Sequence, residues 1–273
     1  MNLESKTVLI TGSTDGVGRL VARRLADQGV RVLVHGRDRL RGEQLVDDIG
    51  AAGHGSAAFL PADLSSLAEV RRLAGAVRQQ CERLDILINN AGIGSGGSTG
   101  NRQVSQDGYE LRFAVNYLAG FLLTRMLLPL MMLSKAARIV NVSSLGQHPI
   151  DFDDVMLTCG YSGSRAYTQS KLAQIMFTFD LARELDPATV TINCLHPATY
   201  MATTMVLQSG VQPLSTVEEG AEAILNLAIS EEVDGRSGEF FNGLLPSRAN
   251  PQAYDQSARE RLRVLSLSLT GLG

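Results

Sequence analysis

Short apolar or β-branched runs alternate with longer helical patterns along this chain, and the alternation limits the folds open to it. The runs with the composition of strands are Lys6–Ile10, Arg31–His35, Ala57–Pro61, Leu84–Ile88, Arg138–Val142, Thr189–Leu195 and Glu239–Phe241. The helical patterns between them cover Val17–Gln28, Arg39–Ile49, Leu67–Cys81, Gly108–Leu133, Ser164–Glu184 and Thr216–Ser230. Strands that alternate with helices form βαβ units, whose parallel strands build one sheet covered on both faces. We therefore predict a single α/β domain over residues 1–273, a Rossmann-type doubly wound parallel sheet of about seven strands with helices on both faces.

In such a sheet, ligands bind at the carboxyl ends of the strands, and a glycine-rich turn stands at the first of these ends. Glycine permits a tight turn and a close approach of the backbone to a pyrophosphate. The helical pattern that follows begins with free N–H groups and a partial positive charge, both of which favour an anion. A turn with a purely structural role is the alternative. We predict that the phosphate-binding residues are Gly12, Ser13, Thr14, Asp15, Gly16, Val17 and Gly18.

The end of the second strand bears on the choice between NAD and NADP. An acidic residue there binds the ribose hydroxyls of NAD, whereas an arginine accommodates the 2′-phosphate of NADP. This strand ends in Gly36-Arg37-Asp38, and a guanidinium can hold a phosphate through two parallel hydrogen bonds. Asp15 and Asp38 place negative charge nearby, and a solvated turn residue is the alternative for Arg37. The pattern favours NADP(H), with NAD as the second choice.

Charge and composition argue against several other classes of protein. The net charge is −3 and the basic residues are scattered, so the basic stripe of a nucleic-acid-binding face is missing. The three cysteines lie far apart, and no group of cysteines and histidines has the spacing of a metal site. The most apolar segment, Tyr117–Leu133, contains Arg125 and Pro129, so we interpret it as a buried or interface helix that falls short of a membrane span. We expect a cytoplasmic protein that binds no metal, nucleic acid or membrane.

Tyr167 and Lys171 are the first catalytic candidates. They stand four residues apart in a helical pattern, so the phenol and the ammonium lie on one helix face. A free tyrosine, with a pKa of about 10, is a weak general acid or base at neutral pH. A nearby cation favours the phenolate, and we expect it to lower the tyrosine pKa. This spacing is common in helices, but the fifth strand ends in Ser143-Ser144, and a serine hydroxyl there is placed to hydrogen-bond a substrate oxygen.

The Gly-x-x-x-Gly-x-Gly turn with its leading threonine, and Asn89-Asn90-Ala91-Gly92 after the fourth strand, resemble the short-chain dehydrogenase/reductase family. The resemblance implies hydride transfer between a nicotinamide cofactor and a ketone or aldehyde and its alcohol, without a metal. Tyr167 is then the general acid/base. Ser144, rather than Ser143, orients the substrate oxygen. Lys171 tunes the tyrosine and binds the nicotinamide ribose.

The resemblance implies further residues beside the cofactor. Asp63-Leu64 resembles the family pair whose carboxylate meets the adenine amino group, and a helix N-cap is the alternative for Asp63. Asn116 falls at the place of the family asparagine that supports a proton-relaying water, with a solvent-facing residue as the alternative. Ala198 stands where the family has glycine. The remaining cofactor contacts are expected from Asn90, Ala91, Gly92, Tyr167, Lys171, Pro197 and Thr199.

Two parts of the chain, Arg138–Lys171 and the C-terminal residues 258–271, look most like the retinol-dehydrogenase-like branch of the family. Members of that branch usually carry an N-terminal membrane anchor, which we expect this chain to lack. An insert at 147–165 and a lid at 198–215 should lie on the substrate side. If Met201 and Met205 of the lid line the pocket, the substrate is apolar or aromatic. Plain packing is the alternative for both methionines.

The resulting prediction is an active NADP(H)-dependent oxidoreductase acting on a small carbonyl compound or alcohol. A sensor or scaffold that binds the cofactor without turnover is the alternative. Such proteins typically lose the tyrosine or the lysine, and this chain has both. The apolar patterns Gly108–Leu133 and Ser164–Glu184 resemble the helix pair at the subunit interface of family dimers and tetramers. We predict a homodimer or homotetramer, with burial of these helices inside one subunit as the alternative.

Overall fold

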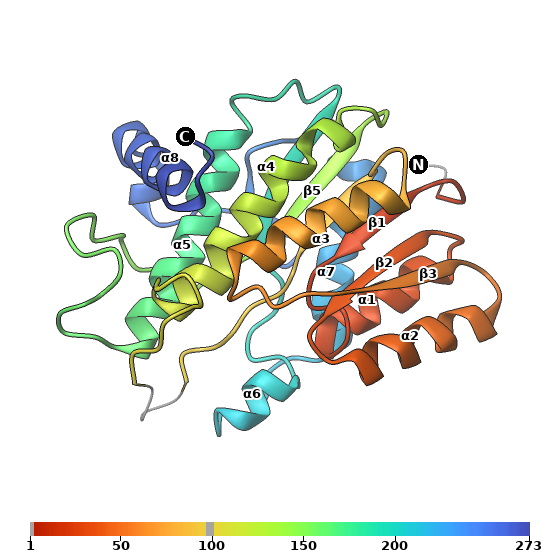
Figure 1. Ribbon diagram of the computed structural model, residues 1–273, viewed down its shortest axis with the longest axis horizontal. Helices are drawn as coiled ribbons and strands as arrows, with labels where there is room; N and C mark the ends of the chain where they lie inside the picture. Colours follow the sequence, from red (N-terminus) through yellow and green to blue (C-terminus); the bar gives the residue numbers. More distant parts are fainter. Residues whose placement is uncertain (1–2, 97–100) are drawn as a thin grey trace.

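The computed structural model describes residues 3–96 and 101–273, and it places one sheet between two layers of helices (Figure 1). The strands are β1 (Thr7–Ile10), β2 (Arg31–Gly36), β3 (Ser56–Pro61), β4 (Ile86–Asn89), β5 (Ala137–Val142), β6 (Val190–His196), β7 (Phe240–Asn242) and β8 (Leu245–Ser247). The α-helices are α1 (Gly16–Ala26), α2 (Arg39–Ala52), α3 (Leu67–Gln80), α4 (Ala119–Met131), α5 (Gly163–Leu181), α6 (Thr204–Gln208), α7 (Val217–Ile229) and α8 (Gln256–Thr270). The shorter helical segments are η1 (Phe113–Leu118, a π-helix), η2 (Glu231–Val233) and η3 (Pro251–Tyr254).

The strand order is β3-β2-β1-β4-β5-β6-β7-β8, with parallel pairing except between β7 and β8. The chain begins at β1, runs outward to β3 and then crosses back to β4 on the other side of β1. Ligands bind at such a reversal, at the carboxyl ends of the strands. The predicted doubly wound sheet is confirmed. The additional strand, β8, has only three residues and contains Pro246, so it carries no periodic apolar signal.

Successive residues of each central strand pack in two separate hydrophobic cores, one on each face of the sheet. In β1, Val8 and Ile10 pack in the core shared with α1, α2 and α7, whereas Leu9 faces the core shared with α3, α4 and α5. Figure 1 shows these two groups of helices on opposite faces of the sheet. Because both faces are covered, the central strands are buried along their whole length and mostly apolar, and this explains why they were recognisable in the sequence.

Helix α8 was not among the predicted helices, although its ends carry recognisable signals. The Asp255 carboxylate caps its first turn by accepting hydrogen bonds from Ser257 N and Ala258 N, at 2.9 and 3.2 Å. Gly271, with φ +62°, ends it in the left-handed conformation. The dense charges between residues 259 and 263 obscure its apolar face in the sequence.

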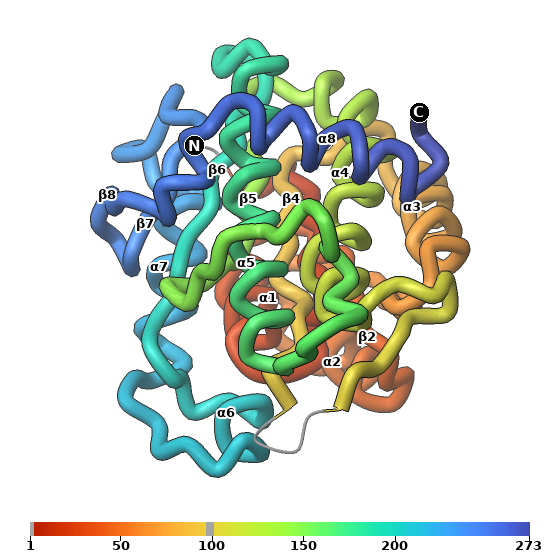
Figure 2. The backbone as a smooth tube through the Cα atoms, turned by 90° about the vertical axis from the view of Figure 1, so that its left-hand side faces the viewer, coloured from red at the N-terminus to blue at the C-terminus, as the bar shows by residue number. Residues whose placement is uncertain are grey.

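Helix α8 packs against α5 and covers the surface on which we predicted a subunit interface (Figure 2). Its Ser266 hydroxyl is 2.6 Å from the Tyr117 hydroxyl of η1, and its Leu269 carbonyl accepts a hydrogen bond from Tyr109 at 2.9 Å. The apolar side chains of α5 are thereby buried within one chain, which is the alternative stated above. The cytoplasmic location and the homodimer or homotetramer stay predictions.

The continuous helical stretch Phe113–Met131, formed by η1 and α4, corrects one sequence interpretation. Among the described residues it is long and apolar enough to cross a membrane by length and composition alone, although we expected this segment to fall short. In this fold 67% of it is buried inside the protein, as expected for a core helix.

Candidate active site

The turn after β1 has glycine where a side chain would not fit. Gly12 (φ +66°) and Gly16 (φ +53°) adopt left-handed backbone conformations that favour glycine. A Cβ on Gly18 would lie 2.4 Å from the Gly12 carbonyl oxygen, so only glycine lets α1 begin this close to the turn. The Asp15 carboxylate caps α1 by accepting a hydrogen bond from Gly16 N at 2.8 Å. The predicted phosphate-binding residues therefore form one tight turn at a helix N-terminus.

Thr11 and Asn90 join this turn to the end of β4. The Thr11 hydroxyl oxygen accepts hydrogen bonds from Asn90 N and Ala91 N, both at 3.0 Å. The Asn90 side-chain amide donates to Thr11 O at 2.9 Å and to Gly12 O at 3.1 Å. A Cβ on Gly12 would lie 2.9 Å from Ala91 Cα, which shows how closely the two segments approach. The structure thus brings together predicted residues that are far apart in the chain.

His35 also holds this turn, a role that its position in an apolar strand did not reveal. Its Nδ1 accepts a hydrogen bond from Gly12 N at 3.1 Å, and its carbonyl accepts one from Ser13 N at 2.9 Å. Burial lowers the pKa of His35 to about 4, so the imidazole is neutral at physiological pH and keeps Nδ1 as an acceptor. The structure gives a core residue that positions the phosphate-binding turn.

Two arginines that follow β2 differ in their surroundings. Arg37 is exposed, and its guanidinium makes no hydrogen bond or ion pair with the residues that the structure describes. Arg41, which we did not single out, forms ion pairs with Asp15 at 3.2 Å and with Asp38 at 3.4 Å. The two acidic groups that seemed to compete for Arg37 are therefore paired with another cation. A Cβ on Gly36 would lie 2.5 Å from the Thr14 hydroxyl oxygen.

Asp63 and Leu64 follow β3, as the sequence indicated. The Asp63 carboxylate accepts a hydrogen bond from Ser65 N at 2.9 Å and does not cap α3. The cap is Ser66, whose hydroxyl accepts from Glu69 N at 3.4 Å, so the N-cap alternative for Asp63 is wrong. Leu64 is buried. The expected contact between Asp63 and an adenine stays a prediction.

Tyr167, Lys171 and Ser144 meet where β5 ends and α5 begins. The Lys171 ammonium lies 5.8 Å from the centre of the Tyr167 ring. A Cβ on Gly146 would lie 3.5 Å from Ser144 Oγ and 4.0 Å from the Tyr167 ring, so the serine hydroxyl lies beside the tyrosine. Ser144 Oγ accepts from Gly146 N at 3.0 Å, whereas the Ser143 hydroxyl donates to Lys171 O at 2.8 Å. Ser143 thus anchors α5 to β5, and Ser144 is the serine that faces the tyrosine hydroxyl.

The pKa values at this centre differ from the simple expectation of a tyrosine activated by a lysine. Burial raises the pKa of Tyr167, an effect that the neighbouring Ser144 hydroxyl opposes. Burial also lowers the pKa of Lys171 to about 7. Its ammonium donates to Val142 O at 2.9 Å and to Gln174 Oε1 at 3.0 Å, both neutral acceptors. Since no anion compensates its desolvation, the lysine titrates near neutrality and its charge does not dominate the tyrosine.

Asn116 is 2% exposed and lies in the π-helix η1, so the solvent-facing alternative is wrong. Its Oδ1 accepts a hydrogen bond from Ile93 N at 2.8 Å, and its Nδ2 donates to Ile93 O at 3.1 Å and to Ser170 Oγ at 3.0 Å. A Cβ on Gly92 would lie 3.3 Å from Asn116 Oδ1 and 3.5 Å from Lys171 Nζ. The asparagine and the lysine therefore both lie beside this glycine, on the side where a side chain would stand.

The loop after β6 completes the rim of this centre. Pro197 is buried, and the Thr199 hydroxyl is 3.0 Å from His196 Nε2. Burial and the nearby charge of Lys171 lower the pKa of His196 to about 4. Tyr200 has φ +46°, a conformation that non-glycine residues rarely adopt. The loop thus carries backbone strain one residue after Thr199, and the predicted contact of Thr199 with the cofactor stays a prediction.

The lid, residues 198–215, contains α6 and rests on the phosphate-binding turn. Thr204 donates a hydrogen bond to the Asp15 carboxylate at 2.8 Å. The two methionines differ. Met201 packs in the core against Gly220 of α7, as its packing alternative predicts. Met205 is 41% exposed and lies beside Gly94, so it is the lid methionine that faces the site.

The insert, residues 147–165, is fastened to α5 by Gln169. The Gln169 amide donates to Val155 O at 2.9 Å and accepts from Asp151 N at 3.3 Å. Ile150 and Val155 are buried under the insert backbone. The location of the insert beside the substrate entrance stays a prediction.

Comparison with known proteins places these features in context. Residues 6–212 match the family described as short chain dehydrogenase. Human retinol dehydrogenase 14 is 37% identical over 298 residues, which covers 99% of this chain and 88% of the human protein. Human retinol dehydrogenase 12 is 34% identical, with coverage of 100% and 88%.

Solved structures are similar over most of the chain. A protein from Mycobacterium paratuberculosis superposes with a TM-score of 0.79 and 29% identity, covering 98% of this chain and 94% of that one. The active-site complex of Pseudomonas aeruginosa RhlG with NADP superposes with a TM-score of 0.70 and 28% identity, covering 88% and 95%.

Proposed function

Because the chain belongs to the short-chain dehydrogenase family, we propose that it interconverts a ketone or aldehyde and its alcohol by hydride transfer with NADP(H), using Tyr167 as the general acid/base. The observation that carries this proposal is the meeting of Tyr167, Ser144 and Lys171 at one edge of the sheet. Lys171 Nζ lies beside Gly92, and the neighbouring Ala91 touches the phosphate-binding turn. An alcohol or carbonyl carbon held there is within reach of both the proton-transferring group and a bound dinucleotide.

The residues of the turn fit a dinucleotide phosphate. The absence of a side chain at Gly12 and Gly18 leaves backbone N–H groups at the start of α1 for an anion. The exposed Arg37 is the cation available for a 2′-phosphate, because Arg41 already pairs with the nearby carboxylates. Thr14 occupies the space that a side chain at Gly36 would need, which disfavours the aspartate typical of NAD binding there. These observations support NADP(H) over NAD.

The protein residues supply the proton transfer. The bound nicotinamide would provide or accept the hydride. Ser144 Oγ orients the substrate oxygen, and the Tyr167 hydroxyl gives its proton to that oxygen in reduction or takes it in oxidation. Lys171, with a pKa of about 7, can gain or lose a proton at neutral pH and so return the tyrosine to its starting state. Asn116, which also lies beside Gly92, holds the backbone next to Lys171 through its hydrogen bonds to Ile93.

The substrate is proposed to be an apolar carbonyl compound or alcohol. Two observations support this class. Human retinol dehydrogenases 14 and 12 are 37% and 34% identical to this chain, and Met205 and Tyr200 are half-exposed apolar side chains at the rim of the site. Flexible methionines adapt to apolar ligands of irregular shape.

The test measures binding and turnover separately. Fluorescence titration with NADPH and with NADH should show NADPH binding at least about tenfold more tightly, since one charge-assisted phosphate contact supplies about 1.5–3 kcal/mol. NADPH oxidation is then followed with retinaldehyde, decanal and a small water-soluble ketone. We expect turnover to be fastest with the two long apolar aldehydes. Equal binding of both cofactors would contradict the NADP(H) preference. A folded, NADPH-bound protein that reduces none of these carbonyls would contradict the proposed reaction.

A further inference from the structure

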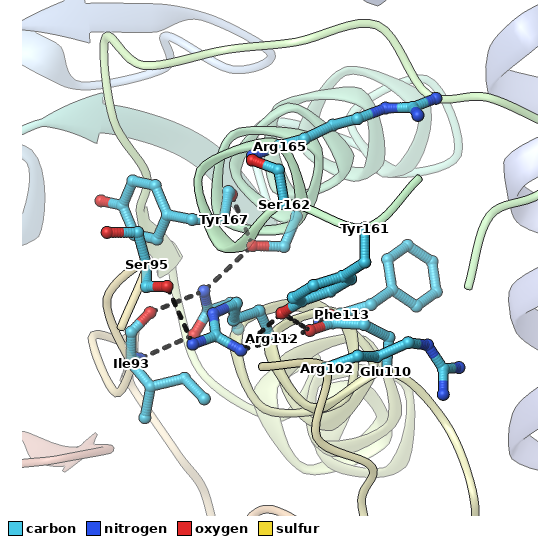
Figure 3. Close-up of polar contacts among 12 residues, drawn as sticks. Ile93, Ser95, Arg102, Glu110, Arg112, Phe113, Tyr161, Ser162, Arg165 and Tyr167 are labelled. Carbon is cyan, nitrogen blue, oxygen red and sulfur yellow. Dashed lines mark hydrogen bonds and ion pairs between the residues drawn. The ribbon is translucent and has the colours of Figure 1, made fainter. Parts of the chain in front are cut away.

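Arg112 is a buried charge beside the candidate site that no motif marks. It is 4% exposed, and its guanidinium donates to Gly94 O and Ser95 O, both at 3.0 Å, and to the Tyr161 hydroxyl at 2.8 Å (Figure 3). Glu110 balances its charge at 3.5 Å and accepts a hydrogen bond from Tyr161 at 3.1 Å. Burial of a charged pair is expensive even when its partners are well placed, so this pair is poorly explained by stability alone.

Arg112 and Asn116 are four residues apart and hold the same segment, residues 93–95. Asn116 binds both backbone polar groups of Ile93, and Arg112 binds the carbonyls of the next two residues. Two side chains from one helical stretch thus hold three successive residues. The segment directly follows the glycine beside Lys171, and the lid methionine Met205 packs on it.

The same contacts join residues 93–95 to the start of α5. A Cβ on Gly163, the first residue of α5, would lie 2.0 Å from Ser95 O, so the helix backbone rests on a carbonyl that Arg112 holds. Tyr161, two residues earlier, binds Arg112 directly. Tyr167 lies four residues after Gly163, about one helical turn along α5. Displacement of residues 93–95 therefore displaces the part of α5 that carries Tyr167.

We propose that Arg112 is a positioning residue: by holding residues 93–95 and Tyr161 together, it sets the place of Tyr167 relative to the cofactor side of the site. This inference rests on the proposed function, because the placement of Tyr167 matters to the rate only if that group transfers a proton. Arginine suits the role because its rigid guanidinium presents donors in several fixed directions at once, which a lysine ammonium on a flexible stem cannot match.

Arg259 provides a matched control for this arginine. It is also buried, at 7% exposure, and it donates to a backbone carbonyl, that of Ala253, at 2.7 Å. That carbonyl belongs to η3 in the C-terminal segment, not to residues 93–95 or to the start of α5. Arg259→Lys therefore reports the general cost of replacing a buried arginine.

The first test compares Arg112→Lys with Arg259→Lys. We expect both variants to lower the melting temperature, and only Arg112→Lys to lower kcat for NADPH oxidation, by about tenfold or more, as expected for a reacting group displaced by a fraction of an ångström. The Kd for NADPH should stay within about twofold of the parent in both variants. An unchanged kcat in folded Arg112→Lys, or an equal loss of kcat in both variants, overturns the proposal.

A milder pair of variants decides the question if Arg112→Lys does not fold. Tyr161→Phe removes the hydroxyl that links Arg112 to the residues just before α5. Tyr109→Phe removes a comparable hydroxyl, which donates to Leu269 O at 2.9 Å. We expect kcat to fall about three- to tenfold in Tyr161→Phe alone. Amide hydrogen exchange over residues 93–96 and 163–171 should become faster in Tyr161→Phe alone.

The two readouts separate failure of this proposal from failure of the proposed function. If the parent protein turns over no carbonyl compound, the proposed reaction is wrong. Hydrogen exchange still tests whether Arg112 and Tyr161 keep residues 93–95 in place. Unchanged exchange in Tyr161→Phe overturns the positioning role whether or not the protein is active.

Discussion

The phosphate-binding turn and the start of α5 meet at one edge of the sheet, yet different physical effects hold them in place. The turn depends on backbone hydrogen bonds, missing side chains at Gly12 and Gly18, and the neutral imidazole of His35. Two buried basic side chains act on α5: Lys171 within the helix, and Arg112, which binds Tyr161 just before its first residue. A change in the turn should therefore alter cofactor binding, whereas a change around α5 should alter the chemical step and its dependence on pH.

Tyr167→Phe should produce the largest effect. The variant should lose catalytic activity and keep its affinity for the cofactor. Loss of the general acid/base is expected to lower kcat/KM by about 100- to 10 000-fold. The Kd for NADPH should stay within about twofold, because the turn after β1 is unchanged. Steady-state kinetics and fluorescence titration measure the two quantities, with Tyr109→Phe as the control. If the variant keeps more than about a tenth of the parent kcat/KM, another group transfers the proton.

Arg37→Ala should show the reverse behaviour, on the cofactor side alone. Removal of the exposed guanidinium should weaken NADPH binding by about 10- to 100-fold and leave NADH binding within about twofold. Arg39→Ala is the matched control, because Arg39 is an exposed arginine in the same region that pairs with Glu43 at 3.1 Å. Titration of all three proteins with both cofactors measures this. Parallel losses in the two variants would show that Arg37 contributes only general positive charge.

Lys171→Met should reveal the cost of the buried charge through the pH dependence of stability. Burial lowers the pKa of Lys171 from its usual 10.5 to about 7, so between these values the unfolded chain binds more protons than the folded one. Lys171 therefore makes stability rise with pH across this window, by at most about 1.4 kcal/mol per pH unit, and adds no slope below it. The variant should lack this slope.

Chemical denaturation of the parent and of Lys171→Met between pH 6 and 9 measures the difference. The stability of the parent relative to the variant should be constant up to about pH 7 and then rise. A constant difference across the whole range would mean that the lysine titrates outside this window.

Much of the fold was predictable because the central strands are buried on both faces and are therefore mostly apolar. The strand β8 and the helix α8 were not predicted, for different reasons. β8 is too short and too exposed to leave a pattern, whereas α8 has clear caps at Asp255 and Gly271 that charged residues partly hide. The burial of α5 within one chain followed from α8, and no feature of α5 itself indicated it.

Within the candidate site, predictability followed the range of the interactions. The glycine turn and the Tyr167–Lys171 spacing are local, so a few neighbouring residues define them. His35, Arg41 and Arg112 act through partners far away in the chain or in pairs that only the folded backbone forms. No short pattern marks such residues.

The amino-acid sequence by itself determined the order of the central strands and helices, the glycine turn, and the placement of Tyr167 and Lys171 on one helix face. These features depend on backbone conformation and on residues one helical turn apart. Only the tertiary structure decided that Lys171 titrates near pH 7 and that burial raises the pKa of Tyr167. It also decided that Arg41 frees Arg37 from the nearby carboxylates. The reason is that desolvation and charge pairing depend on every group that surrounds a side chain, and those groups come from all parts of the chain.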